Sequence, residues 1–292
     1  MKQPEFVKGR RRLPPWFKVK LNTGPRFRHL KETLNQLNLH TVCEEAQCPN
    51  QWECWNQGTA TFMILGDICT RSCGFCSVQS GRPTELDLEE PYRVADAVGR
   101  LGLRHVVVTS VNRDELDDGG ASVFAKTIEQ IRVASPSSTI EVLIPDFRGV
   151  WGALDLVLNA QPDILNHNME TVPRLYSLVR PQAKYRRSIE LLKRSKDFGV
   201  VTKTGLMLGL GEQYDEVQRV MRDLCEIQCD ILTLGQYLQP TVQHLPVVRF
   251  YHPDEFQRFK EEGLKMGFHH VESGPLVRSS YHAEEQVPLE LQ

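Results

Sequence analysis

The sequence of 292 residues lacks several features that define specialised classes of protein. No apolar run approaches the ~20 residues needed to cross a bilayer, which argues against a membrane-spanning helix. The basic residues near the N-terminus are followed by no apolar segment, which argues against a secretory signal. The 35 basic and 37 acidic residues leave a net charge of −2, which favours neither a nucleic-acid coat nor an acidic tail. We therefore expect a cytoplasmic protein that binds no membrane and no nucleic acid.

Internal repeats and low-complexity tracts are absent as well. Hydrophobic residues make up 40% of the chain and charged residues 25%, which is typical of a globular protein. The length suffices for one large α/β domain or for two small domains.

Short apolar or β-branched runs alternate with segments of helical apolar spacing after residue 60. The predicted strands are Thr61–Leu65, His105–Thr109, Ile140–Ile144, Asp163–Leu165, Val201–Met207 and Asp230–Leu234. Six successive strand–helix units predict the α/β class, with a parallel sheet curved into a partial (β/α)6 barrel of the TIM type.

The two ends of the chain do not follow this rhythm. We expect an N-terminal extension over residues 1–60, a barrel over 61–250 and a C-terminal extension over 251–292. The C-terminal extension begins with a predicted helix, Pro253–Met266, and continues as a loop over Val271–His282. Both extensions are expected to cap the open face of the barrel, where the carboxyl ends of the strands bring catalytic loops together.

Six of the eight cysteines fall between Cys43 and Cys76. In a reducing cytoplasm this crowding favours metal ligation over disulfides. Cys69, Cys73 and Cys76 form C-x3-C-x2-C directly after the first predicted strand, and three thiolates for a cluster of four irons leave one iron open. The alternative is a structural zinc knot, which would need a fourth soft or histidine ligand nearby.

Cys43, Cys48 and Cys54 form a second set, C-x4-C-x5-C. A second iron–sulfur cluster is one interpretation. Buried structural cysteines, or a zinc site shared with a histidine such as His40, are the others. Cys225 and Cys229 stand apart near a predicted helix end and are interpreted as core residues.

Several motifs together carry a family resemblance. The segment CTRSCGFCSV is similar to the signature of radical S-adenosylmethionine enzymes. The segments CEEAQCPNQWECW, VVTSVNRDELDDGG, LTLGQYLQP and GPLVRSSYHA, in this order, resemble the lipoyl synthase family, so the resemblance covers nearly the whole chain.

The resemblance implies S-adenosylmethionine and two [4Fe–4S] clusters as cofactors. The first cluster would use Cys69, Cys73 and Cys76, and the auxiliary cluster would use Cys43, Cys48, Cys54 and a serine of the Arg278–Tyr281 motif. We assign that serine as Ser279, with Ser280 as the second choice; without the resemblance, the pair would be interpreted as a solvated turn. Catalytic roles are thereby predicted for Cys69, Cys73, Cys76 and Ser279.

Polar residues after the predicted strands are candidates for binding S-adenosylmethionine. Thr109 and Ser110 close the second strand, and Asn168 and Glu170 follow the fourth. Arg187 is a candidate for clamping a carboxylate, although a solvated helix face is the alternative for this arginine.

The resemblance further implies a sulfurtransferase that inserts two sulfur atoms into an octanoyl chain on a lipoyl carrier protein, with the auxiliary cluster as sulfur donor. The expected partners are the H protein of glycine cleavage, the E2 domains of 2-oxoacid dehydrogenases, and ferredoxin or flavodoxin as reductant. A methylthiotransferase, an iron–sulfur electron carrier and a zinc-scaffolded binding module are the competing interpretations.

Overall fold

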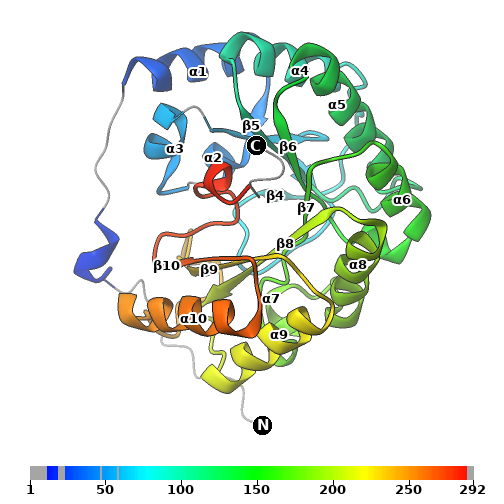
Figure 1. Cartoon of the computed structure of the whole chain (residues 1–292). Helices are drawn as coiled ribbons and strands as arrows, with labels where there is room; N and C mark the ends of the chain where they lie inside the picture. Colours follow the sequence, from blue (N-terminus) through cyan, green and yellow to red (C-terminus); the bar gives the residue numbers. More distant parts are fainter. Residues whose placement is uncertain (1–11, 19–23, 47, 58, 288–292) are drawn as a thin grey trace.

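A computed structural model describes residues 12–18, 24–46, 48–57 and 59–287. Its centre is one eight-stranded sheet, ordered β1-β2-β5-β6-β7-β8-β9-β10 (Figure 1). Every neighbouring pair is parallel except β1 with β2. The strands are β1 (His40–Thr41), β2 (Thr61–Ile64), β5 (His105–Ser110), β6 (Thr139–Leu143), β7 (Ile164–Asn166), β8 (Val201–Leu208), β9 (Ile231–Gln236) and β10 (His270–Gly274).

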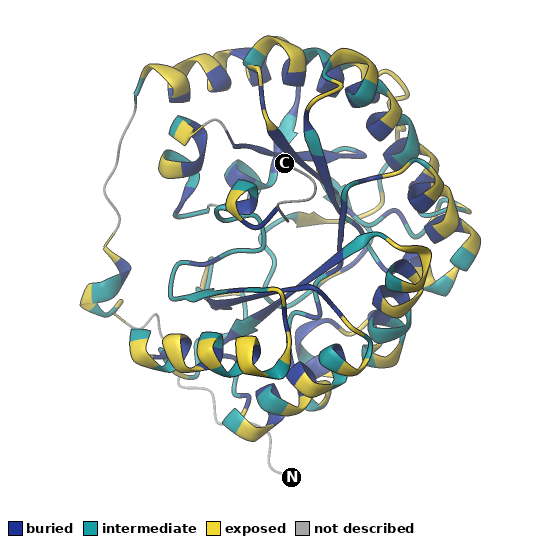
Figure 2. Cartoon of the chain, viewed as in Figure 1, coloured by how far each residue is buried: buried dark blue, intermediate teal, exposed yellow. Residues whose placement is uncertain are grey.

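Helices surround the convex side of this curved sheet. Their outer faces are exposed, whereas the strands are almost wholly buried (Figure 2). This burial explains why the strands have continuous apolar runs in place of alternation. The helices on this side are α4 (Glu90–Leu101), α5 (Ala121–Ala134), α6 (Trp151–Asn159), α8 (Tyr185–Phe198), α9 (Tyr214–Glu226) and α10 (Pro253–Met266).

The sheet is open, because β1 and β10 form its two edges. The predicted partial barrel and its six parallel strands are thereby confirmed. The predicted loop over Val271–His282 is wrong at its start, because β10 pairs in parallel with β9 from His270 to Gly274. Only Val271 of this strand is fully buried, so no apolar run marked the strand in the sequence.

Described parts of the N-terminal and C-terminal extensions meet inside the opening of the sheet. The N-terminal part contributes α1 (Pro25–Gln36), α2 (Val42–Glu45) and α3 (Gln51–Gln57), and the last described residues lie beside α2 and α3 (Figure 1). The side-chain amide of Asn50 donates to the carbonyl of Leu276 at 2.6 Å. A Cβ on Gly235 would lie 2.0 Å from the carbonyl oxygen of Val277, so glycine allows the C-terminal segment to cross the end of β9.

The barrel interior holds a buried ion pair below the carboxyl ends of the strands. Nζ of Lys203 on β8 lies 2.9 Å from Oε2 of Glu141 on β6, and both side chains are fully buried. Burial acts to raise the pKa of Glu141, but the charges and hydrogen bonds of Lys203 and His105 together outweigh it and lower that pKa to about 2. The Glu141 carboxylate is therefore ionised at neutral pH.

None of the helices within the described residues combines the length with the hydropathy that a membrane span requires.

Candidate active site

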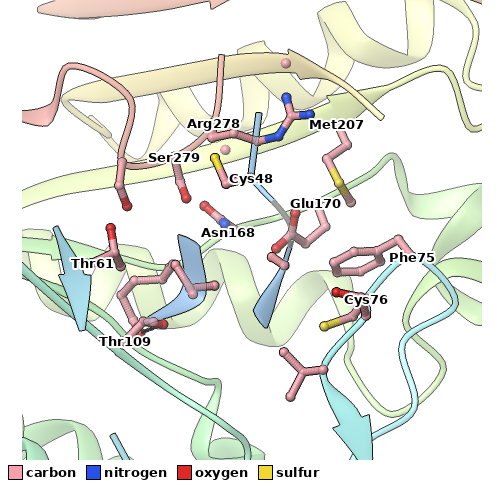
Figure 3. Close-up of a pocket in the computed structure, with 18 of the residues that line it drawn as sticks. Cys48, Thr61, Phe75, Cys76, Thr109, Asn168, Glu170, Met207, Arg278 and Ser279 are labelled. Atoms are coloured by element: carbon pink, nitrogen blue, oxygen red, sulfur yellow. Dashed lines mark hydrogen bonds between the residues drawn. The ribbon is translucent and has the colours of Figure 1, made fainter. Parts of the chain in front are cut away.

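A cavity of about 530 Å³ opens at the carboxyl ends of the barrel strands. All six cysteines of the two predicted triplets line it, together with residues that end β5, β6, β8 and β9. In the close-up view, Cys48, Arg278 and Ser279 lie on one side, Cys76 and Phe75 lie on the other, and Asn168 and Glu170 lie between (Figure 3). The fold thus joins two cysteine sets from separate segments of the chain.

The first triplet lies on an irregular loop between two short paired strands, β3 (Ile68–Cys69) and β4 (Gln79–Ser80). Cys69, Cys73 and Cys76 are each half-buried. Gly74 fixes this loop, because its amide donates to the carbonyl of Val179 and its carbonyl accepts from the amide of Leu245, both at 2.9 Å. The carboxyl end of the short helix that ends at Val179 and the loop around Leu245 therefore hold the triplet in place.

Burial also sets the protonation of these thiols. It raises the pKa of Cys73 to about 12, although the guanidinium of Arg180 opposes the rise. Burial likewise raises the pKa of Cys76 to about 11. Without a metal both side chains are neutral thiols at pH 7, and metal binding must release their protons.

The second triplet is supplied by the N-terminal extension. Cys43 lies in α2 and Cys54 in α3, with Cys48 between them. Burial raises the pKa of Cys43 to about 11 and that of Cys54 further. The serines of the predicted motif, Ser279 and Ser280, line the same cavity, with Ser279 beside Cys48 in the close-up (Figure 3).

Four of the five residues predicted to bind S-adenosylmethionine line the cavity: Thr109, Ser110, Asn168 and Glu170. The hydroxyl of Ser110 and the side-chain carbonyl of Asn168 are buried without a hydrogen-bond partner. Buried polar atoms are normally paired, so these two indicate a polar ligand. Thr109 has a partner already, because its hydroxyl donates to the carbonyl of Leu143 at 2.9 Å.

The fifth residue, Arg187, is not among the residues that line the cavity. Its Nη1 lies 3.0 Å from Oδ2 of Asp146, a carboxylate with no exposed surface. Arg187 also does not extend from a solvated helix face, because it is largely buried in this ion pair.

An arginine that the sequence analysis did not select occupies the cavity instead. Arg180 is 9% exposed and donates from Nη1 to the backbone carbonyl of Asn168 at 2.5 Å. Its Nε is buried without a partner. Its charge acts on both Cys73 and Glu170. Burial raises the pKa of each of these groups, and Arg180 acts to lower it. No local pattern marks this residue, which the turn after α7 (Tyr176–Val179) brings into the cavity.

The donor set suits an iron–sulfur cluster. Among the described residues, no group of three or more histidine, cysteine, aspartate or glutamate side chains is arranged to hold a single metal ion. A cubane needs a wider arrangement, because each thiolate binds its own iron at a separate corner. His40, the alternative zinc partner, does not line the cavity, and its Nδ1 lies 3.5 Å from Oε1 of Glu45.

The remaining candidates lie in the core. Cys229 is fully enclosed in the cluster around β8 and β9, and Cys225 packs against that cluster. Trp52 and Trp55 of α3 pack on Phe27 of α1, with ring centroids 4.7 and 5.0 Å apart, and both belong to the apolar cluster that includes the second triplet.

Comparison with known families gives two matches to this chain. The model of the radical SAM superfamily matches residues 63–224, and the model of the N-terminal domain of lipoyl synthase matches residues 2–48. A lipoyl synthase of Rubrobacter xylanophilus is 64% identical over 96% of this chain and 88% of its own length. A lipoyl synthase of Symbiobacterium thermophilum is 61% identical over 94% of this chain and 87% of its own.

Solved structures share the fold at low sequence identity. SuiB of Streptococcus suis, bound to its precursor peptide, aligns with a TM-score of 0.58 and 11% identity over 85% of this chain. HydG, a maturase of the [FeFe]-hydrogenase, aligns with a TM-score of 0.53 and 12% identity over 88%. The alignments cover 52% and 63% of those longer chains.

Proposed function

The chain belongs to the lipoyl synthase family of the radical S-adenosylmethionine superfamily, and from that premise we propose that it inserts two sulfur atoms into an octanoyl chain. The chain that receives the sulfur is attached to a lysine of a lipoyl carrier protein. The observation that carries the proposal is the single cavity lined by both cysteine triplets and by Ser279. A radical formed at the first triplet needs its sulfur source within reach, and a cluster on the second triplet would meet that need.

We assign two [4Fe–4S] clusters to the cavity. Cys69, Cys73 and Cys76 would hold the first and leave one iron open for S-adenosylmethionine. Cys43, Cys48, Cys54 and Ser279 would hold the auxiliary cluster. When bound, these groups supply the one-electron cleavage that yields an adenosyl radical and the sulfur that enters the product.

The polar residues between the two triplets would bind the amino-acid part of S-adenosylmethionine. The carboxylate finds a buried cation in Arg180, and the amine finds acceptors in Asn168 and Glu170. The unpartnered hydroxyl of Ser110 offers a further contact to the cofactor. Arg187 is not proposed for this role, since it is bound to Asp146.

Apolar side chains cover much of the remaining wall of the cavity. Met63, Leu206, Met207 and Val277 belong to this apolar part. Such a wall suits an alkyl chain and keeps water away from a carbon radical. Octanoylated glycine cleavage H protein and E2 domains are the proposed carriers, and ferredoxin or flavodoxin is the proposed reductant.

Two further predictions from the sequence remain predictions. The division into residues 1–60, 61–250 and 251–292 is one of them, and one sheet runs through all three segments. The cytoplasmic location is the other.

The test uses anaerobically reconstituted protein with dithionite, S-adenosylmethionine and an octanoyl-lysine peptide, with products read by mass spectrometry. We expect a peptide that gains two sulfur atoms, together with 5′-deoxyadenosine. Formation of 5′-deoxyadenosine without sulfur in the peptide would contradict the octanoyl substrate and favour a related activity such as methylthiolation. Neither product, from protein with its full iron content, would reject the enzyme and favour an electron carrier.

A further inference from the structure

The loop that carries the first triplet is fastened to the barrel by Arg71. This side chain is only 4% exposed. Its Nε and Nη2 donate to the two carboxylate oxygens of Asp114 at 2.7 and 2.8 Å. Nη2 also donates to Oδ1 of Asp146 at 2.6 Å. One buried cation therefore joins the cysteine loop to the segments that follow β5 and β6.

Thr70 adds a second connection to the segment after β5. Its hydroxyl donates to the carbonyl of Asn112 at 2.9 Å and accepts from the amide of Asp114 at 3.0 Å. Its own amide donates to the same Asn112 carbonyl at 3.0 Å. Thr70 and Arg71 thus hold residues 112–114 in one position against the loop.

This arrangement directs backbone amides at the sulfur of Cys69. The amide nitrogen of Asn112 lies 3.3 Å from Sγ, and that of Arg71 lies 3.4 Å from it. Amide hydrogen bonds to a ligand sulfur draw negative charge away from an iron–sulfur cluster. They thereby favour its reduced form and raise its reduction potential.

We propose that Arg71 is a positioning residue for reduction of the first cluster, which holds the Asn112 amide on Cys69 by clamping Asp114 and Asp146. It acts through that amide, so its loss lowers the reduction potential even when the cluster is retained. The inference rests on the proposed function, because it requires the first triplet to bind the cluster.

The side chain could also affect the potential through its charge alone. A lysine at this position keeps the charge, but its ammonium group cannot reproduce the fork that binds both oxygens of Asp114 and also reaches Asp146. Arg71→Lys therefore separates the position of the amide from the charge, and Arg71→Met removes both.

The experiment is a redox titration of the reconstituted full chain, followed by electron paramagnetic resonance. The signal that responds to added S-adenosylmethionine identifies the cluster of the first triplet. At one fixed solution potential, we expect the ratio of reduced to oxidised cluster to fall about tenfold in both Arg71 variants. For a one-electron couple, this corresponds to a reduction potential that is lower by about 59 mV. The matched control is Arg174→Lys, because Arg174 binds Glu216 with the same fork at 2.9 and 2.8 Å but does not line the cavity.

A wild-type potential in Arg71→Lys would overturn the inference, whether or not Arg71→Met shifts. If the Arg71 variants retain too little iron to titrate, Asp114→Asn decides. It replaces one carboxylate oxygen of the clamp with an NH2 group that cannot accept from the guanidinium, and it leaves Arg71 in place. Loss of the Asp114 charge alone would raise the potential, so a fully loaded Asp114→Asn whose potential is not lowered would overturn the inference equally. A wild-type paramagnetic signal that does not change when S-adenosylmethionine is added would instead contradict the proposed function, and this inference with it.

Discussion

Each cysteine of the two triplets is partly or fully buried, and this burial affects the assembly of clusters on them. Burial raises the pKa of Cys43 and Cys76 to about 11 and that of Cys73 to about 12. Without a cluster these three side chains are therefore neutral thiols, which is the less costly state in an apolar environment. Binding iron and sulfide then requires proton release, so cluster assembly should become more favourable as the pH rises.

The two triplets should fail in different ways when mutated. Replacing Cys69, Cys73 or Cys76 with alanine should abolish cleavage of S-adenosylmethionine, because the open iron is lost with its cluster. Replacing Cys43, Cys48 or Cys54 should spare some cleavage and stop sulfur insertion. Measuring 5′-deoxyadenosine and the thiolated peptide in parallel separates the two effects. Cleavage that survives in the first group would contradict this assignment of clusters to triplets.

Arg180 and Arg187 offer a direct comparison at the cofactor site. We expect Arg180→Leu to raise KM for S-adenosylmethionine by about tenfold or more, because the variant loses a charge-assisted hydrogen bond that contributes roughly 1.5–3 kcal/mol. Arg187→Leu should have a smaller effect on KM, because Arg187 contacts Asp146 outside the cavity lining. Equal effects of the two variants on KM, measured with kcat, would restore Arg187 as a cofactor residue.

At the scale of elements, α3 and the C-terminal segment form a clasp over the second triplet. The hydroxyl of Tyr281 lies 3.4 and 3.3 Å from the carboxylate oxygens of Glu53, and Nε2 of His282 lies 3.2 Å from the same group. Glu53 is next to Cys54, and Tyr281 is two residues from Ser279. The clasp therefore connects a predicted cysteine ligand with the predicted serine ligand.

Glu53→Ala should weaken the second site and leave the first site intact. The expected result is a chain whose iron and sulfide content after gel filtration falls toward that of a single cluster, while the signal that responds to S-adenosylmethionine remains. Glu285→Ala is the control, because Glu285 contacts His282, with 3.5 Å between Oε2 and Nδ1, from within the C-terminal segment. Full iron retention in Glu53→Ala would show that the clasp is dispensable.

The elements differ in how well the sequence predicts them. β5 was evident from three consecutive valines, 106–108, because a strand buried on both faces needs a continuous apolar run. β10 was missed because its partner β9 supplies the hydrogen bonds, while the strand itself has little apolar character. The spacing of soft ligands predicts the two cysteine triplets, which the fold brings to one cavity. Arg180 reaches the same cavity through a turn that local spacing does not describe.

On the scale of the whole molecule, the open sheet leaves a gap, and the described parts of the N-terminal and C-terminal extensions close it around one cavity. Electrostatics inside this fold also make its stability depend on pH. His167 is enclosed, with Nδ1 2.8 Å from the carbonyl of Ile144 and Nε2 2.9 Å from the hydroxyl of Ser188. Burial, and then the charge of Arg180, lower the pKa of His167 to about 4.

This histidine should destabilise the fold in mild acid. Below its unfolded pKa of ~6.5 the unfolded chain binds a proton that the folded chain does not, so the free energy of unfolding falls until the pH reaches the folded value. Between pH 7 and pH 5 the loss should be about 2 kcal/mol. Urea unfolding of wild type and His167→Gln under anaerobic conditions measures it. The variant should show the flatter pH dependence, and identical slopes would contradict the assignment.

The measurement that tests the central claim most directly follows the sulfur atoms from the protein to the product. Protein is reconstituted with 34S-labelled sulfide, freed of excess sulfide, and given S-adenosylmethionine and an octanoyl-lysine peptide with unlabelled sulfur compounds in solution. If the cluster beside the substrate is the donor, mass spectrometry should find two 34S atoms in each product molecule, limited to about one product per chain. A product that carries sulfur of natural abundance would contradict the claim that one cavity holds both the radical and its sulfur source.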